Sequence, residues 1–256
     1  MRVSWQRSWL PGICVLFIGG CATVAATKWD QMYGPTEPRD RLVASNSEAG
    51  QHFLTEVQPM LEQRCVVCHG CYDSPCQLNL ASPEGVDRGA SKDKVYNSAR
   101  FRAAPLNRLF EDAQTTAEWR QKGFWPVLNE HEQTPQVNLD ASIMSHMMQL
   151  KRDHPLPDVA VLDEKEFDLN LNRDEFCAKA DELDKFDRKH PTWGMPYALP
   201  GLADSEFALL QGWLKQGAQM AQPPAYGPEA QALVTGMGSI SERRQSQAAA
   251  DEPLYL

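Results

Sequence analysis

Apolar residues recur at helical spacing just before the first pair of cysteines, which predicts an amphipathic helix there. Ser45, with Glu48 three residues later, has the form of a capping box and would begin this helix. Pro59 is expected to divide it into a helix and a short second turn that ends at Cys65. The apolar face consists of Phe53, Leu54, Val57 and Leu61.

A second amphipathic helix is predicted near the other end of the chain, after a loop rich in proline and glycine at 191–202. Asp204 is the expected N-cap, and Gly217 lies just past the expected end. Its apolar face consists of Phe207, Leu210 and Leu214. This helix is expected to pack against the helix that precedes Cys65.

The region between these helices, 77–190, is irregular in pattern and predicts long loops with three helical stretches. These stretches are 113–122, 142–151 and a heavily charged one at 174–186. The polar, alanine-rich tail at 223–256 is expected to be disordered. The fold class is therefore predicted as mainly α, with one folded domain at 47–222 that contains a long, loop-rich insertion at 77–190.

The N-terminus reads as a secretory signal peptide over residues 1–26. Two arginines, Arg2 and Arg7, precede an apolar run from Leu10 to Ile18, and small residues follow. The run is shorter than the roughly 20 residues that a membrane-spanning helix needs. Cleavage before Cys21, with acylation of that residue as in a lipoprotein, is the alternative. We therefore expect export to the periplasm, followed by an extended linker at 27–46.

The formal net charge of -9 argues mainly against certain binding partners. It gives no electrostatic reason to bind nucleic acid, and an anionic membrane surface would repel the chain.

The chemistry centres on Cys65-Val66-Val67-Cys68-His69, a CxxCH motif at the end of the first amphipathic helix. Two residues between the thiols let both sulfur atoms reach the two vinyl groups on one edge of a haem, and the adjacent histidine then ligates the iron. Behind an export signal this motif predicts one covalent c-type haem. Its attachment would require the cytochrome c maturation machinery.

Two other interpretations of the cysteines remain open at this point. Cys65, Cys68, Cys71 and Cys76 with His69 could form a zinc knuckle, although such sites belong mostly to reducing compartments. Cys65 and Cys68 could also be a dithiol redox pair, but no thioredoxin-like pattern surrounds them. In the preferred interpretation Cys71 and Cys76 close a small disulfide loop, since Pro75 and turn-forming residues lie between them. Cys177 would then be unpaired and buried.

A second iron ligand is expected on the opposite face of the haem, and Met195 is the best candidate. It lies in Gly194-Met195-Pro196, a rigid loop that can hold a thioether towards iron. With this ligand, the domain at 47–222 is predicted to be a cytochrome c-like haem domain that contains the insertion. An open sixth position is the alternative to a second ligand. Rival ligands are Met144, Met147 and Met148, and the histidines His52, His131, His146, His154 and His190.

With these residues in place, the chain resembles the bacterial fatty acid cis/trans isomerases. The run CVVCHGCYDSPCQL is much more specific than CxxCH alone, and the resemblance covers roughly 28–226. The stretches that carry it are Arg64–Leu78, Asp112–Arg120, Lys122–Asn129 and Gly194–Tyr197.

The resemblance implies a periplasmic haem enzyme that converts cis double bonds in the acyl chains of membrane phospholipids to trans. Ferric haem would withdraw electron density from the alkene, and the bond would rotate before the density returns. Members of the family are longer, so we expect this chain to be a truncated form or the haem-bearing N-terminal part. The alternative function is that of a periplasmic c-type cytochrome that transfers electrons. Trp119, Phe124 and Trp125 are either a lipid-facing cluster or, as aromatic residues more often are, part of the core.

Overall fold

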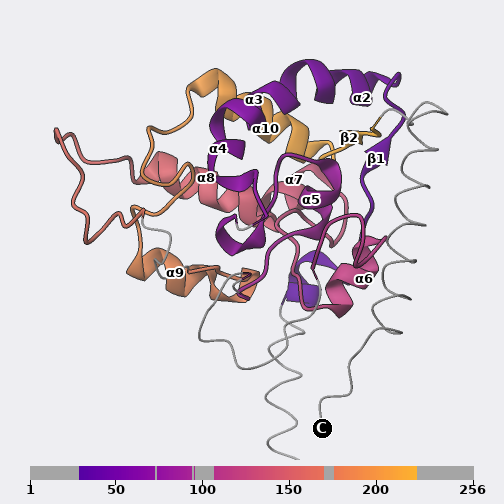
Figure 1. Cartoon of the computed structure of the whole chain (residues 1–256), viewed down its shortest axis with the longest axis horizontal. Coiled ribbons are helices and arrows are strands. Elements are labelled where there is room, and N and C mark those ends of the chain that lie inside the picture. The colour runs from indigo at the N-terminus through magenta and orange to yellow at the C-terminus, as the bar shows by residue number, and fades with distance from the viewer. Residues whose placement is uncertain (1–28, 73, 94, 96–106, 170–175, 224–256) are drawn as a thin grey trace, which may run out of the picture. The chain divides into compact units, whose positions relative to one another are not determined.

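The computed structural model describes residues 29–72, 74–93, 95, 107–169 and 176–223, which form mainly helices joined by loops (Figure 1). The mainly α class predicted from the sequence is confirmed. The predicted signal peptide and all but the first residue of the predicted tail lie outside the described residues.

The first amphipathic helix is present as three consecutive segments: α2 (Glu48–His52), the π-helical turn η1 (Phe53–Val57) and α3 (Gln58–Arg64). Its N-cap is Ser47, whose Oγ accepts a hydrogen bond from Gly50 N at 3.1 Å, so the prediction of Ser45 as the cap is wrong by two residues. Pro59 lies in the first turn of α3, where the missing N–H of proline costs no hydrogen bond within that helix.

The second amphipathic helix, α10 (Asp204–Lys215), packs against η1 as expected. The rings of Phe53 and Trp213 lie 6.2 Å apart across this contact. Ala203 is the N-cap position, and its backbone N–H donates to the carboxylate of Glu206 at 2.8 Å, so Asp204 is the first helical residue rather than the cap. Gly217 follows the helix with a left-handed φ of 87°, a conformation that suits glycine.

The region 77–190 is not separate from this helix pair. Its side chains Leu80, Val86, Val127, Leu128 and Met148 belong to the same buried cluster as Val57, Leu61, Leu210 and Leu214. Its helical segments are α5 (Pro83–Arg88), α6 (Thr116–Gln121), α7 (Pro135–Asp140), α8 (Ile143–Asp153), η3 (Ala180–Glu182) and α9 (Leu183–Lys189). What the sequence predicts as an insertion therefore builds the main core.

The three helical stretches predicted in this region correspond to observed helices with shifted ends. The helix predicted at 113–122 is shorter, because Thr115 caps α6 through a reciprocal capping box with Glu118. The helix predicted at 142–151 is α8, with Ser142 as its N-cap. The charged stretch becomes helical only from Ala180 and continues to Lys189, and residues 170–175 lie outside the described part of the chain.

The segment predicted as a linker, 27–46, contributes to the fold. Its strand β1 (Leu42–Val43) pairs in parallel with β2 (Met220–Ala221), so the two ends of the folded region are joined. Arg41, directly before β1, is buried and forms an ion pair of 2.7 Å with the carboxylate of Asp87.

Two aromatic residues considered for lipid contact are in the core. Trp119 is 1% exposed and Phe124 5% exposed, and their rings meet edge to face at 5.2 Å. The core interpretation is therefore correct for both. Within the described segments, no helix combines the length and apolar character that crossing a membrane would require.

Candidate functional site

Cys65, Cys68 and His69 lie together on a single helical turn. Cys65 ends α3, and the backbone N–H groups of Cys68 and His69 both donate to its carbonyl oxygen, at 3.1 Å and 3.0 Å, to open α4 (Val66–His69). Both cysteines are free thiols, with Cys65 half-buried and Cys68 exposed. The two sulfur atoms and the imidazole therefore come from one short, well-ordered turn.

The ring of His69 is oriented by the strand-like segment that follows. Its Nδ1 lies 3.1 Å from the carbonyl oxygen of Leu78, and its own carbonyl accepts from Leu80 N at 2.7 Å. A carbonyl can only accept, so Nδ1 carries a proton, and in the neutral imidazole Nε2 then carries the lone pair. Metal-ligating histidines have this arrangement, because an acceptor at the other ring nitrogen fixes both the tautomer and the direction of the ring. The geometry of His69 fits an iron ligand.

Burial raises the pKa of the Cys65 thiol to about 11, with Arg64 opposing part of the effect. Reactive redox cysteines have a lowered pKa, because the thiolate is the nucleophile. This counts against Cys65 and Cys68 as a dithiol redox pair.

The zinc knuckle also finds no support in the described part of the chain. No group of three or more His, Cys, Asp or Glu side chains there is placed to hold a metal ion. One of the four cysteines that it would need, Cys76, is in a disulfide bond.

That disulfide joins Cys76 to Cys177, so the predicted pairing of Cys71 with Cys76 is wrong. The Cα atoms of the bonded pair lie 5.5 Å apart, and 101 positions separate them in the sequence. Cys76 packs against the main core, on the side where Cys177 is buried, whereas Cys71 is an exposed free thiol. Cys177 is buried as expected but not unpaired. The bridge ties the loop after His69 to the segment that leads to α9.

A buried polar network holds the same loop, and sequence reasoning missed it. Arg88 is 1% exposed, donates to the carbonyl oxygens of Gln77 and Asn107, and lies 5.0 Å from the ring centroid of Phe124. Asn107 also accepts from the hydroxyl of Tyr72. Burial lowers the pKa of Arg88 to about 10. The position of Arg88 within Val86-Asp87-Arg88 gives no periodic signal of this role.

Met195 packs against α8. Its backbone N–H donates to the carbonyl of Met147 at 2.9 Å, and its side chain packs with Met147, Leu150 and Phe186. The Met195–Pro196 peptide bond is cis. Arg64, directly before Cys65, connects the cysteine turn to the turn that follows the Met195 loop, because its guanidinium donates to the carbonyl of Gly201 at 2.9 Å. Met195 as an iron ligand stays a prediction.

Three of the other candidate iron ligands are engaged in different surroundings. Met148 is in the main core, and His190 stacks on Trp193 with ring centroids 4.0 Å apart. His146 forms a 2.9 Å contact with the carboxylate of Asp187.

Lys151 is the most unusual polar side chain near the Met195 loop. It lies on α8, is 1% exposed, and its amine has no hydrogen-bond partner among the described residues. Burial lowers its pKa to about 8.

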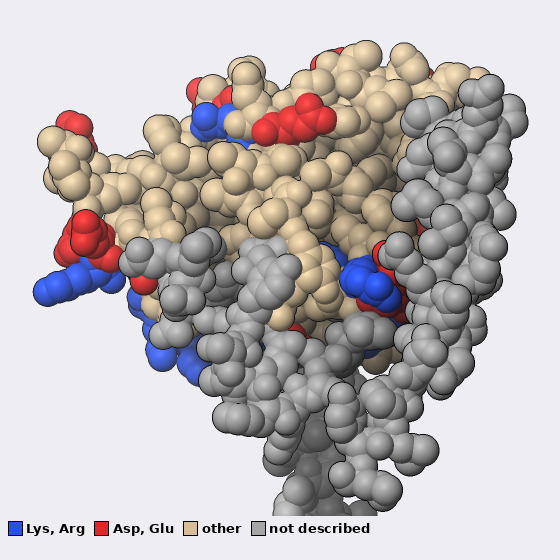
Figure 2. Space-filling view, viewed as in Figure 1, with Lys and Arg blue, Asp and Glu red and all other residues tan. Residues whose placement is uncertain are grey.

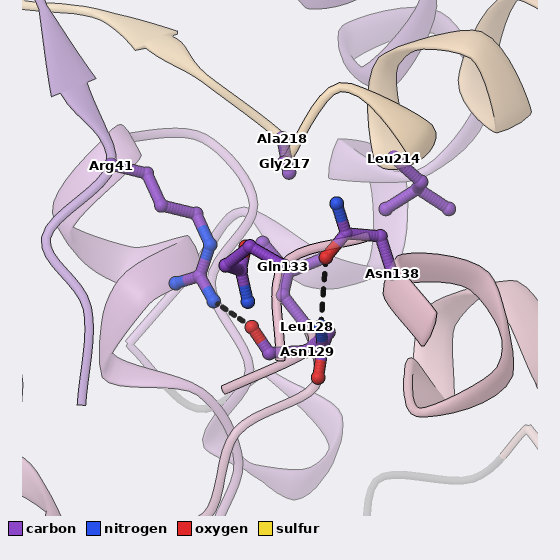
Figure 3. Close-up of a pocket in the computed structure, with 8 residues that line it drawn as sticks. All are labelled: Arg41, Leu128, Asn129, Gln133, Asn138, Leu214, Gly217 and Ala218. Carbon is purple, nitrogen blue, oxygen red and sulfur yellow. Dashed lines mark hydrogen bonds between the residues drawn. The ribbon is translucent and has the colours of Figure 1, made fainter. Parts of the chain in front are cut away.

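A narrow gap that is too small to admit a water molecule lies elsewhere, between β1, α7 and the end of α10 (Figure 3). Its polar groups bond one another: Arg41 donates to the carbonyl of Asn129 at 2.7 Å, and the Asn129 amide donates to Asn138 at 2.7 Å. Asn138 in turn donates to the carbonyl of Lys215 at 3.0 Å. Because these side chains already satisfy one another, we interpret the gap as structural.

Comparison with models of known protein families finds one family that matches the chain. Residues 104–244, more than half of the sequence, match the model of the fatty acid cis/trans isomerase family. The chain belongs to this family. No curated protein and no solved structure matches it. The match includes Asp112–Asn129 and Met195, which carry part of the resemblance noted from the sequence. It begins after the Cys65–His69 turn, so the isomerase family match and the haem motif are two separate observations.

Proposed function

We propose that this chain is a haem-dependent periplasmic isomerase that converts cis double bonds in the acyl chains of membrane phospholipids to trans. Membership of the fatty acid cis/trans isomerase family is the observation that carries the reaction class. The CxxCH turn, with His69 oriented by the carbonyl of Leu78, supports the haem.

The chain's own part in this chemistry is to attach and orient the cofactor. Cys65 and Cys68 would form the two thioether bonds, and Nε2 of His69 would ligate the iron. When bound, the haem supplies an iron centre that withdraws electron density from the alkene and weakens its π bond. No atom or net charge is transferred in the reaction, so no further titrating group or co-reactant is needed.

The surface around the turn suits an apolar ligand. Val67, between the two cysteines, is 71% exposed, and Tyr72 is also exposed. Figure 2 shows uncharged surface over much of the face that carries α4 and α8, with basic and acidic side chains side by side above it, near α3. A haem attached there would cover exposed apolar surface such as Val67.

The test is the trans/cis ratio of membrane palmitoleate and oleate in a host that matures c-type cytochromes and lacks its own isomerase. Solvent stress should raise the ratio in cells that express this chain, and His69→Ala should abolish the rise. A matched pair of cysteine variants separates attachment from general thiol effects. Cys68→Ser should lose both the covalent haem and the activity, whereas Cys71→Ser should keep both, because Cys71 is a free exposed thiol outside the CxxCH motif.

A ratio that stays at the level of the His69→Ala cells would reject the isomerase assignment. If the same haem-loaded protein is rapidly oxidised by a soluble acceptor, the electron-transfer function becomes the better explanation.

A further inference from the structure

The proposed substrate lies within a bilayer, so the chain needs a surface that meets lipid. The formal net charge of -9 opposes approach to anionic lipid, and Trp119 and Phe124 are buried in the core. A local surface that differs in composition from the rest of the chain would overcome this repulsion.

The last turn of α9 and the loop after it form such a surface. Lys185, Arg188 and Lys189 are exposed and lie at i, i+3 and i+4 positions of α9, so they share one face of that helix. From Arg188 to Ala203 the sequence contains two Lys or Arg residues and no Asp or Glu. Figure 2 shows basic side chains at the lower left, below the position that α9 has in Figure 1.

The acidic side chains of this region leave the exposed face of α9 positive. Asp187 pairs with His146 at 2.9 Å, and Glu182, directly before the helix, pairs with Lys92 at 2.7 Å. Asp184 is the remaining acid of the helix, against three basic residues. Basic residues near the C-terminal end of a helix also complement its macrodipole, so the charges alone do not identify a partner.

A group of aromatic rings continues the basic face. His190 directly follows α9, and its ring stacks on Trp193 with centroids 4.0 Å apart. The rings of Phe176 and Tyr197 lie 5.4 Å and 5.5 Å from that of Trp193. Phe176 is 53% exposed, and Trp193 and Tyr197 are half-buried. These rings are therefore partly in water and directly beside the basic turn.

The inner side of the same loop is anchored, which keeps the rings at the surface. Met195, between Trp193 and Tyr197, packs with the buried side chains of Met147 and Phe186. Its backbone N–H also donates to the Met147 carbonyl at 2.9 Å. The loop thus has one side in the core and the other side towards solvent.

We propose that this surface docks on the headgroup region of a phospholipid bilayer that contains anionic lipid. We call it the α9 surface, and it consists of Phe176, Lys185, Arg188, Lys189, Trp193 and Tyr197. Lys and Arg are attracted to anionic headgroups, and Trp and Tyr favour the boundary between headgroups and acyl chains. An acidic protein would match the charges as well, but the half-exposed rings favour lipid. The choice of a bilayer rests on the proposed function, whose substrate lies in one.

The experiment is sedimentation of the full, haem-loaded chain with lipid vesicles, without any isomerase readout. The wild type should bind vesicles of phosphatidylethanolamine and phosphatidylglycerol more tightly than vesicles of phosphatidylcholine alone. Arg188→Gln with Lys189→Gln should weaken binding to the anionic vesicles about thirtyfold, since each basic group near such a surface contributes about fivefold. The matched control is Lys122→Gln with Lys215→Gln, which removes two charges at the ends of α6 and α10 and should change binding less than about twofold.

The rings are tested by a second pair of variants. Phe176→Ser should weaken binding to both kinds of vesicle by about fivefold, because roughly half of its side chain is still available for burial in lipid. Phe110→Ser is the matched control, since Phe110 is 62% exposed and lies outside the α9 surface, on a loop that Glu84 holds. It should leave binding nearly unchanged.

Equal effects of the two charge variants, or equal effects of the two phenylalanine variants, would overturn the proposal. A wild type that binds both kinds of vesicle equally would also overturn it. Thermal unfolding checks that each variant is folded, and if Phe176→Ser is not, the two charge variants decide alone.

The same measurements separate this proposal from the proposed function. Vesicle binding that depends on the α9 surface, without any rise in trans lipid, would leave the docking surface standing and reject the isomerase. Isomerisation of lipid together with unchanged binding of the Arg188 and Lys189 variant would reject the docking surface alone.

Discussion

Gly194 is a position where one added methyl group should be strongly destabilising. Its chain passes so close to the end of α8 that a β-carbon would lie 2.2 Å from the N atom of Lys151, 2.5 Å from its Cα and 2.8 Å from the carbonyl carbon of Leu150. All three atoms belong to the backbone of a helix and cannot rotate away. Gly194→Ala must therefore push the Met195 loop off α8.

The size of the effect follows from these distances. Ordinary van der Waals contact begins near 3.4 Å, so the two segments must separate by about 1.2 Å (3.4 − 2.2). Overpacking of this kind costs about 1–3 kcal/mol. The hydrogen bond from Met195 N to the Met147 carbonyl, now 2.9 Å, would be stretched or lost, at about 1 kcal/mol more. We expect Gly194→Ala to lower the free energy of unfolding by about 3 kcal/mol.

Urea unfolding followed by tryptophan fluorescence measures this change, with the disulfide kept intact. Gly212→Ala is the matched control: it lies within α10, and a β-carbon there would meet nothing within 4 Å. It should raise the free energy of unfolding by about 0.5–1 kcal/mol, because alanine loses less backbone entropy in a helix than glycine. If Gly194→Ala unfolds within about 0.5 kcal/mol of the wild type, the close backbone contact is not real and the argument fails.

Three further predictions concern the disulfide bond, the N-cap of α2 and the buried Lys151. Cys177→Ser should lower the free energy of unfolding by about 4–5 kcal/mol, because opening a loop of roughly 100 residues raises the entropy of the unfolded chain. Cys71→Ser should change the free energy of unfolding little, and thermal unfolding of the two variants measures the difference. Ser47→Ala should cost about 1 kcal/mol in urea unfolding and Ser45→Ala under about 0.5 kcal/mol, and equal effects would contradict the assigned cap. In the haem-free chain, the pKa of Lys151 is about 8 in the folded state and 10.5 in the unfolded state, so between these pH values the unfolded state binds more protons. The free energy of unfolding should therefore rise with pH in that window. Lys151→Met should not show this rise.

The sequence predicted well those elements that local rules determine. α10 and its terminal Gly217 followed from a clean apolar face and turn chemistry, and the helix expected at 142–151 is present as α8. Ser45 failed as a cap because two serines stand two positions apart, and only the path of the backbone decides which hydroxyl reaches a helical N–H.

Features that depend on distant parts of the chain were not predictable. The pairing of Cys76 with Cys177 joins residues 101 positions apart, and nothing local to either one indicates the other. The same holds for Arg88, whose burial depends on carbonyls from the loop after His69. Lys151 reads in the sequence as an ordinary charged residue at the end of an amphipathic helix, and only its burial makes it distinctive.

The burial of Cys65 bears on how the polypeptide would survive oxidation before any cofactor reaches it. Thiol–disulfide exchange proceeds through the thiolate, and a thiol with a pKa of about 11 is almost entirely protonated near neutral pH. Cys65 should therefore react slowly with disulfide bonds, and it should be a slow partner for Cys68. A chain that has closed the Cys76–Cys177 bridge would then still hold Cys65 as a thiol, available for the thioether bond.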